Sequence, residues 1–356
     1  MSSPGSAAVM QTRLVPRKAL SVLHLIAFAD AYLADDAVTE ICVNRPREVW
    51  CEARSTWTRH EATELDLDHL LALATAVARY CDDDSSDTRP ILSAVLPHGE
   101  RVQIVRPPAC EDGTVSVTIR KPTRDAFSLD DYSAQGFFDH VVPVDGEITR
   151  DEAELLALKR KGRHREFFAR AVAAERVIVV AGETGSGKTT FMRSLIGEVP
   201  PEQRIITIED TPELFMEGTH PNRVHLFYRS EDRDMESAVT ATTLLRSCLR
   251  MKPTRIMLAE LRGGETYDFL SVAASGHGGS ITSCHAGSCE LAFERLALMV
   301  LQNAQGRMLP YEVIRRLLFS VIDVVVHIHN DVVGGTGRHI SEIWFDPAKK
   351  RAQVAT

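Results

Sequence analysis

The sequence has 356 residues, which is more than one hydrophobic core usually serves, so we expect two domains. Hydrophobic residues make up 44% and charged residues 25% of the chain, the composition of an ordinary folded protein. The formal charge of −8 excludes an overall basic charge of the kind that favours nucleic-acid binding, but it does not exclude a local basic patch.

Residues 1–125 predict an α+β domain. Apolar residues recur at helical spacing from Leu20 to Ala31, which predicts an amphipathic helix rather than a signal peptide. Alternating or apolar runs then predict several short strands, and strong periodicity predicts a helix over 67–81. The predicted strands are 39–44, 47–52, 56–61, 91–96, 101–105 and 115–120.

Residues 126–150 mix prolines, glycine, polar and aromatic residues, and we interpret them as a linker with some structure of its own. From 151 to 356, strands alternate with helices, such as one predicted over 235–252. The predicted strands are 176–182, 204–210, 255–261, 280–285 and 321–328. Continuous apolar strands separated by helices favour an α/β domain, with a parallel sheet covered on both faces.

The seven cysteines are scattered, and none forms C-x-x-C. Neither a disulfide framework nor a zinc ribbon is indicated, and a reducing cytoplasm fits best. No segment approaches the roughly 18 apolar residues that a membrane span requires. Peripheral membrane attachment through partners remains possible.

GETGSGKT at 182–189 fits G-x-x-x-x-G-K-[ST], and it follows an apolar strand and precedes a helix. Backbone N–H groups of such a loop wrap phosphates, and the helix N-terminus adds its positive dipole end. We expect Lys188 to reach the β- and γ-phosphates of ATP and the Thr189 hydroxyl to bind Mg²⁺. The residues expected to contact the nucleotide are Gly182, Glu183, Thr184, Gly185, Ser186, Gly187, Lys188, Thr189 and Thr190.

Two further strands end in carboxylates. TIEDTPEL at 207–214 places Glu209 and Asp210 at the carboxyl end of a strand, where open α/β sheets bind ligands. Glu209 is the candidate base for the attacking water. LAELRGGET at 258–266 delivers Glu260 to the same edge, where its longer arm suits contact with the Mg²⁺ shell through water. The alternative for the first motif is a helix-capping Asp210 with a surface Glu209, and the alternative for the second is a plain strand end.

SGHGGSITSCHA at 275–286 combines glycines, two histidines and a cysteine, and it first suggests a metal site. His277 and His285 are eight residues apart with no paired ligands nearby, so tetrahedral zinc is poorly supported. His285 instead emerges near Glu260, where its imidazole can hydrogen-bond the γ-phosphate. Cys284 is expected to pack inward as a small hydrophobe. A buried structural histidine is the remaining alternative.

Arg101 and Arg120 lie on neighbouring predicted strands of the first domain. Alternation places Arg120 on the face opposite Val117 and Ile119. Arginines on an open sheet face are commonly just solvated. They can instead complete the nucleotide site from outside the domain that carries the phosphate loop. An arginine so placed raises the rate of phosphoryl transfer by a factor of roughly 10³–10⁵.

Together these motifs resemble the traffic ATPases of type IV secretion, the eleventh component of VirB-type systems, within the superfamily that also drives type II secretion. The resemblance covers nearly the whole chain and rests on four boxes: GETGSGKTT, RIITIEDTPEL, LRMKPTRIMLAELRGGE and SGHGGSITSCHA. It implies a homo-hexameric ring of two-domain subunits, with RecA-like C-terminal domains. ATP would bind between the domains, where Arg101 and Arg120 match family arginines that reach the phosphates.

The resemblance further implies a motor on the cytoplasmic face of the bacterial inner membrane, acting with an inner-membrane ATPase and the coupling protein, without sequence-specific nucleic acid. The histidine box departs from the family at Gly278 and Cys284, neither of which touches the imidazole. The long linker resembles the branch whose N-terminal domain packs over a neighbouring subunit. Two alternatives stay open: a nucleic-acid motor with the same core, and a scaffold that binds nucleotide only to assemble.

Overall fold

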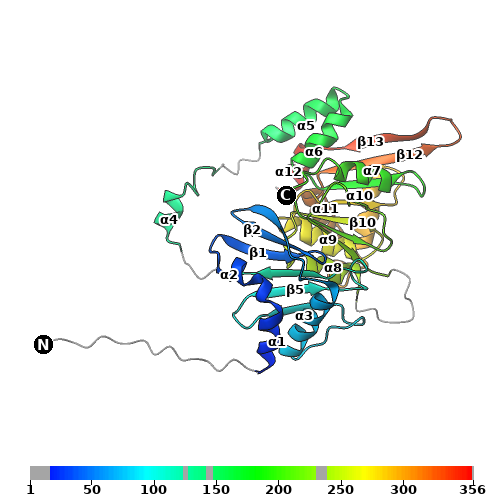
Figure 1. Ribbon diagram of the computed structural model, residues 1–356. Coiled ribbons are helices and arrows are strands. Elements are labelled where there is room, and N and C mark those ends of the chain that lie inside the picture. Colours follow the sequence, from blue (N-terminus) through cyan, green and yellow to red (C-terminus); the bar gives the residue numbers. More distant parts are fainter. Residues whose placement is uncertain (1–16, 123–126, 142–146, 230–238, 355–356) are drawn as a thin grey trace.

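A computed structural model describes residues 17–122, 127–141, 147–229 and 239–354. Two sheets with their own helices lie against one another (Figure 1). No helix within the described ranges is long and apolar enough to cross a membrane.

The N-terminal sheet has the order β3-β2-β1-β6-β5-β4, and all neighbouring strands are antiparallel. Its elements are α1 (Arg17–Leu25), η1 (Ala27–Ala29), α2 (Asp30–Ala34), β1 (Val38–Val43), β2 (Glu48–Ala53), β3 (Thr56–Glu61), α3 (Leu67–Tyr80), β4 (Ile91–Val95), β5 (Arg101–Val105) and β6 (Ser116–Arg120). The strand predictions and the 67–81 helix are confirmed. The first predicted helix is interrupted, because a 3₁₀ turn separates α1 from α2.

Only one face of this sheet is covered by its own helices. Ile41 and Ile119 pack there with Leu70 and Leu73 of α3 in one buried cluster. The opposite face is covered in part: Thr118 on that face is almost fully buried, whereas the Arg120 side chain on the same face is exposed. That face packs instead toward the C-terminal domain.

The C-terminal sheet has the order β13-β12-β7-β11-β10-β8-β9. Its strands are β7 (Ile178–Gly182), β8 (Ile205–Glu209), β9 (Arg223–Phe227), β10 (Arg255–Leu261), β11 (Ile281–Cys284), β12 (Val324–Asp331) and β13 (Gly337–Trp344). The helices are α5 (Arg150–Arg160), α6 (His164–Ala173), α7 (Lys188–Ile196), α8 (Ala241–Cys248), α9 (Glu265–Ala274), α10 (Cys289–Val300), η2 (Gly306–Met308), α11 (Tyr311–Val321) and α12 (Pro347–Val354).

Both faces of this sheet are covered, as predicted. On β7, Ile178 and Val180 pack into the cluster beneath α6 and α7, whereas Val179 and Ala181 pack into the cluster beneath α8 to α11. A strand buried on both faces has no polar alternation, which explains its continuous apolar sequence.

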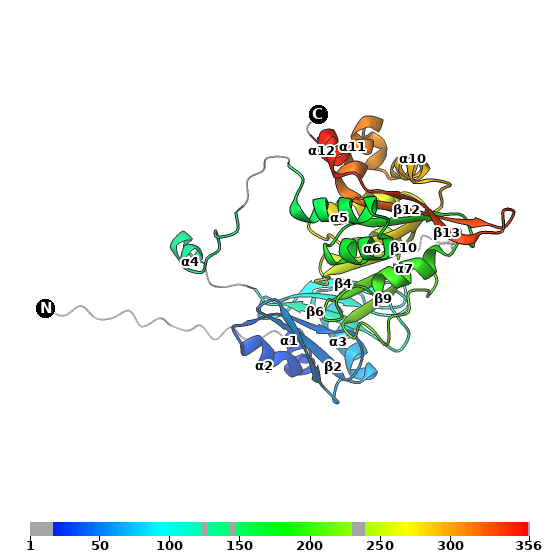
Figure 2. The ribbon, with the colours of Figure 1, turned by 90° about the horizontal axis from the view of Figure 1, so that it is seen from above.

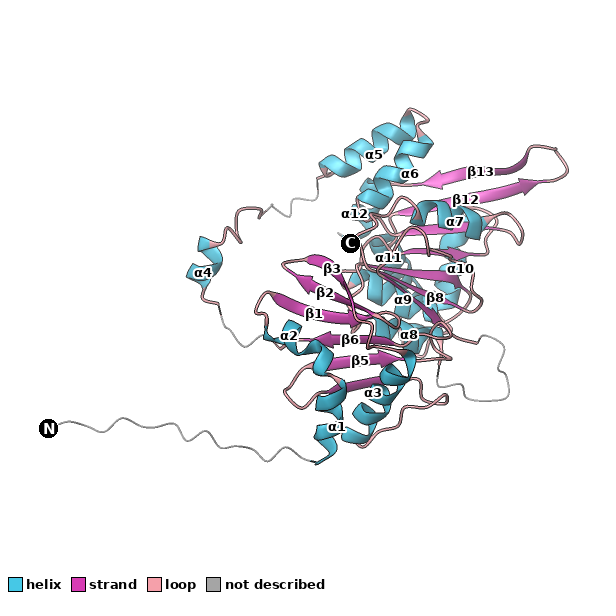
Figure 3. Cartoon of the chain, viewed as in Figure 1, coloured by secondary structure: helices cyan, strands magenta, loops and turns pink. Residues whose placement is uncertain are grey.

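The prediction of an all-parallel sheet is wrong at one edge. β13 pairs antiparallel with β12, and the resulting hairpin reaches beyond the rest of the sheet (Figure 3). Neither β13 nor β9 was predicted, because both mix charged residues into their runs. The predicted helix over 235–252 is shorter in the structure, where α8 covers Ala241–Cys248; residues 230–238 lie outside the described ranges.

A buried arginine joins the two domains. Arg204, at the start of β8, is fully buried, and its guanidinium donates to Asn44 of the N-terminal domain (2.5 Å) and to Asn222 (2.7 Å). Its Nε donates to the carbonyl oxygen of Met251 at 2.9 Å. Charge-assisted hydrogen bonds of this kind fix the N-terminal sheet against the β9 edge.

The linker carries one short helix, α4 (Leu129–Ala134), which stands apart from both sheets in two perpendicular views (Figures 1 and 2). Ser128 and Asp131 form a capping box at its start. The ring of Tyr132 contacts the rings of Phe127 and Phe137. The linker therefore has some structure, as expected. Its predicted limits cannot be compared in full, since residues 123–126 and 142–146 lie outside the described ranges.

Candidate active site

The glycine-rich loop connects β7 to α7, as the motif predicts. Gly185 (φ +75°) and Gly187 (φ +98°) occupy the left-handed region that side chains disfavour. A Cβ added to Gly182 would lie 2.6 Å from both the carbonyl oxygen of Ile328 and Oγ of Ser186. Glycine is thus required here by backbone conformation and by close approach, and the loop opens onto the N-terminus of α7.

Lys188 is the first residue of α7 and is buried. Its Nζ donates to the carbonyl oxygens of Gly182 and Glu183, both at 3.0 Å, and lies 3.3 Å from Nδ1 of His285. Burial lowers the pKa of Lys188, and the carboxylate of Glu260 opposes that shift. These partners hold the ammonium at the phosphate loop.

A continuous chain of polar contacts runs from this lysine along the sheet edge. His285 Nε2 lies 2.8 Å from Glu260 Oε1, and Arg262 Nε donates to Glu260 Oε2 at 2.7 Å. Arg262 also pairs with Asp210. Lys188 Nζ thus lies next to one ring nitrogen of His285, and Glu260 lies next to the other.

Sheet topology explains why these residues meet. β8, β10, β11 and β7 are neighbouring parallel strands, so their carboxyl ends share one edge. The approach of His285 to Glu260 is as predicted, and Cys284 is buried as expected. His277 precedes β11 and His285 follows it, so the strand separates the two histidines. Within the described ranges, no group of three His, Cys, Asp or Glu side chains is placed to hold a metal ion.

Glu209 is placed differently from the expectation of a catalytic base. Its side chain is 1% exposed, and Oε2 accepts from the backbone N–H groups of Glu213 and Leu214, both at 2.8 Å. Oε1 accepts from the Thr207 hydroxyl at 2.6 Å and lies 3.2 Å from Nδ1 of His225. Burial raises the pKa of Glu209, but these hydrogen bonds outweigh it and lower the pKa overall. The carboxylate thus anchors the loop after β8 and is not free to approach a water.

The loop that Glu209 anchors brings Glu213 to the phosphate loop. The Thr189 hydroxyl donates to Glu213 Oε2 at 3.0 Å. Sequence reasoning missed Glu213, although it lies in the same motif, because the path of the chain beyond β8 depends on the buried Glu209 contacts. The Thr189 hydroxyl and the Glu260 carboxylate are oxygen donors of the type that Mg²⁺ prefers.

Arg338 of β13 is a second residue that sequence reasoning missed. Its Nε donates to the carbonyl oxygen of Gly185 at 3.0 Å. No motif marks Arg338, and its approach to the phosphate loop requires the antiparallel hairpin that the sequence did not predict.

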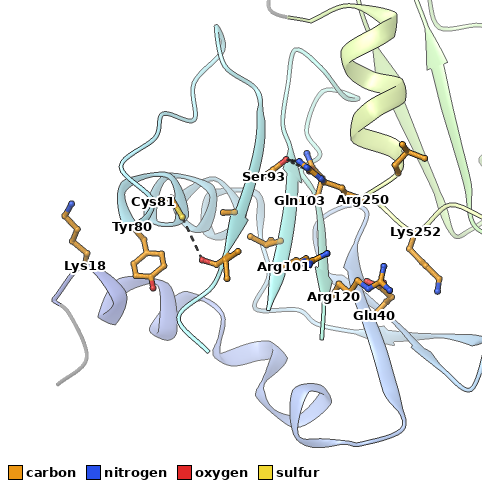
Figure 4. A pocket seen from close by; sticks show the side chains of 14 residues that line it. Lys18, Glu40, Tyr80, Cys81, Ser93, Arg101, Gln103, Arg120, Arg250 and Lys252 are labelled. Atoms are coloured by element: carbon orange, nitrogen blue, oxygen red, sulfur yellow. Dashed lines mark hydrogen bonds and ion pairs between the residues drawn. The ribbon is translucent and has the colours of Figure 1, made fainter. Parts of the chain in front are cut away.

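Arg101 and Arg120 do not join this site within the chain. They lie opposite each other on β5 and β6 and line a cavity of about 860 Å³ together with Leu249, Arg250 and Lys252 of the C-terminal domain (Figure 4). Those three residues precede β10, whereas Glu260 lies near its carboxyl end. The cavity that holds Arg101 and Arg120 therefore lies near the start of β10, away from the carboxyl ends of the strands where the phosphate loop of the same chain lies.

Comparison with known proteins places these features in a family. Residues 148–331 match the family model described as Type II/IV secretion system protein. The chain is 63% identical to the type IV secretion system protein VirB11 of Brucella abortus over 353 residues, which cover 99% of this chain and 97% of that protein. It is 49% identical to the type IV secretion system protein PtlH of Bordetella pertussis over 329 residues, covering 92% and 96%.

A solved structure agrees in fold. The crystal structure of the VirB11 ATPase from the Brucella suis type IV secretion system, in complex with sulphate, matches with a TM-score of 0.90 at 63% identity, covering 95% of this chain and 98% of that one. The similarity thus extends over nearly the full length of the chain and is not limited to the four motifs of the site. The chain is a member of the VirB11 family of type IV secretion ATPases.

Proposed function

We propose that the chain works as a Mg²⁺-dependent ring ATPase on the cytoplasmic face of the inner membrane, where hydrolysis of ATP powers type IV secretion. The observation that carries this proposal is the contact chain from Lys188 through His285, Glu260 and Arg262 to Asp210 beside a glycine loop. A site of this kind binds a triphosphate and senses its terminal phosphate.

The residues divide the work by chemistry. Backbone N–H groups of residues 182–190 wrap the phosphates, and Lys188 moves from its carbonyl partners to the β- and γ-phosphates. Thr189 and Glu260 would hold Mg²⁺, Glu260 partly through water, and the bound ion would neutralise phosphate charge. His285 lies between the lysine and Glu260, so loss of the γ-phosphate would change the polar contacts of both ring nitrogens.

Glu213 takes the place of Glu209 as the proposed base. Its carboxylate is exposed and contacts Thr189, whereas that of Glu209 is buried with four donors around it. A general base must come within hydrogen-bond reach of the water that it activates. The exposed Glu213 can move toward such a water without breaking buried contacts, whereas Glu209 cannot.

A ring explains the position of the arginines. We propose a homo-hexamer in which Arg101 and Arg120 of one subunit reach the phosphates held by its neighbour. Support comes from their location in the cavity near the start of β10, away from the phosphate loop of their own chain. Helix α4 of the linker stands apart from both sheets (Figure 2). We propose that the linker is long enough for the N-terminal domain of one subunit to pack on a second copy of the chain.

The partners are proposed from the relatives, which are named as type IV secretion system proteins. We propose that the ring acts with an inner-membrane ATPase and the coupling protein of the same system, and that it contacts no specific nucleic-acid sequence. The charge of −8 agrees with this. Hydrolysis strongly stimulated by single-stranded DNA at physiological salt would favour a nucleic-acid motor instead.

Two experiments test the proposal. Lys188→Ala should abolish ATP turnover, and normal turnover by this variant would overturn the assignment; nucleotide binding without any turnover by the unmodified chain would favour the scaffold. Mixing subunits tests the ring. A Lys188→Ala subunit retains its arginines, and an Arg101→Ala/Arg120→Ala subunit retains its phosphate loop. Each should be inactive alone, and a mixture should recover activity only if the arginines act on a neighbour.

A further inference from the structure

A row of charged side chains crosses four strands of the N-terminal sheet. In the strand register Glu52 of β2 lies opposite Glu40 of β1, Glu40 lies opposite Arg120 of β6, and Arg120 lies opposite Arg101 of β5. Residues directly opposite each other in neighbouring strands share one face and interact. Three members of the row, Glu40, Arg120 and Arg101, line the cavity described above, so one acid stands next to two arginines at its wall (Figure 4).

The two acids in this row are bonded very differently. Glu52 Oε2 accepts from the Thr39 hydroxyl at 2.8 Å and lies 3.2 Å from Nζ of Lys252. Glu40 is 3% exposed, and its Oε2 is buried with no hydrogen-bond partner among the described residues. Its Oε1 lies 3.6 Å from Nε of Arg120, which is an ion pair without a hydrogen bond. An unsatisfied buried carboxylate oxygen is costly, so Glu40 calls for an explanation.

Arg120 offers one. Its side chain is 66% exposed and extends into the cavity, and its nearest acidic partner in the structure is Glu40. Arg101 and Arg120 repel each other across their strand pair, and the charge of Glu40 offsets that repulsion. A phosphate arriving at the two arginines would compete with this carboxylate for the same cation and would be repelled by it.

We propose that Glu40 is a positioning residue that holds Arg120 in the cavity and competes with the nucleotide phosphates for it. This inference rests on the proposed function, in which Arg120 reaches the phosphates held by a neighbouring subunit. Glu40 then sets the affinity of the ring for ATP, and this affinity rises when Glu40 takes up a proton.

The surroundings of Glu40 place this protonation near neutrality. Burial raises the pKa of Glu40 to about 7, against the lowering effect of Arg120, Lys252 and Arg204, while Glu52 adds to the rise. These are the charged groups that face it, with Arg101 and Arg250 further along the cavity. A phosphate would raise the pKa further by adding negative charge and drawing Arg120 away. Binding is therefore linked to proton uptake, and affinity falls as pH rises from about 6 to 8.

Glu40→Gln keeps the shape of the side chain and removes its charge. The assembled ring carrying this change should have a KM for ATP lower by about three- to fivefold at pH 8, the effect of removing one charge from an ion pair whose arginine is exposed, with little difference at pH 6 and an unchanged kcat. The ratio of KM values for the two rings is measured at each pH, because the γ-phosphate of ATP also titrates in this range. Glu52→Gln is the matched control, since Glu52 is bonded elsewhere, and it should keep the pH dependence.

A second measurement compares the same two rings. Calorimetric titration of a non-hydrolysable ATP analogue, in two buffers with different ionisation enthalpies, should reveal more proton uptake near pH 7 by the wild-type ring than by the Glu40→Gln ring. Equal KM ratios at pH 6 and pH 8, or equal proton uptake by the two rings at pH 7, would overturn the role of Glu40. If the mixed-subunit experiment fails instead, the placement of Arg120 on a neighbouring nucleotide is what fails, whatever Glu40 does.

Discussion

Substitutions of Glu209 test whether this residue has a structural or a catalytic role. Replacing it by glutamine keeps its size and leaves an amide that can still accept from the two backbone N–H groups and donate toward Thr207 and His225. An amide cannot take a proton from water. If Glu209 anchors the loop, Glu209→Gln should retain turnover within a few-fold of wild type. If Glu209 were the base, the loss would be about 10²–10⁴-fold.

Glu209→Ala supplies the energetic side of the same prediction. It leaves the backbone N–H groups of Glu213 and Leu214 without their acceptor. Each orphaned buried donor costs about 1–3 kcal/mol, so we expect a loss of about 4 kcal/mol in the free energy of unfolding. For a domain of this size, that loss corresponds to a fall in Tm of about 8–16 °C.

Thermal unfolding followed by circular dichroism, together with ATP turnover well below Tm, measures both effects on the same preparations. Glu213→Gln is the matched variant, because Glu213 is exposed and should give the opposite pattern: unchanged Tm and a large loss of turnover. An inactive Glu209→Gln with wild-type Tm, beside an active Glu213→Gln, would refute the reasoning.

Three further predictions follow from the same geometry. His285→Ala should keep ATP binding, since Lys188 retains two carbonyl partners, but should cut hydrolysis; unchanged turnover would return His285 to a structural role. Gly182→Ala would bring a Cβ within 2.6 Å of the Ile328 carbonyl oxygen, so nucleotide binding should be lost, and an intact affinity measured by calorimetry would contradict this. The folded-state pKa of Glu209 lies below its unfolded value of about 4.3, so its contribution to stability is present above about pH 4.3 and is lost as pH falls through the folded pKa. The difference in Tm between wild type and Glu209→Ala should shrink over that acid range.

Local sequence determined the phosphate loop and the strand ends around it. The glycines of the loop are set by backbone conformation, and the apolar runs before Asp210, Glu260 and His285 are set by burial on two faces. Parallel strands then bring their carboxyl ends together without any further specification. The set of residues at this edge of the sheet could therefore be predicted from the order and spacing of the motifs alone.

Tertiary structure decided which side chains of that edge are free. Glu209 and Glu213 belong to one motif, and only the contacts of Thr207, His225 and two backbone N–H groups make one buried and the other exposed. Arg338 reaches the loop through an edge hairpin whose strand carries no strong pattern. Such contacts join residues distant in sequence, and residue type does not encode them.

The positions of Arg101 and Arg120 were decided in the same way. Sequence alternation gave the face on which Arg120 lies, but not the surface against which that face packs. Arg204 and Asn44 fix the N-terminal sheet against the β9 edge, and this turns both arginines toward a cavity near the start of β10. How two separately cored domains dock depends on the fit of their whole surfaces, which only the folded chain contains.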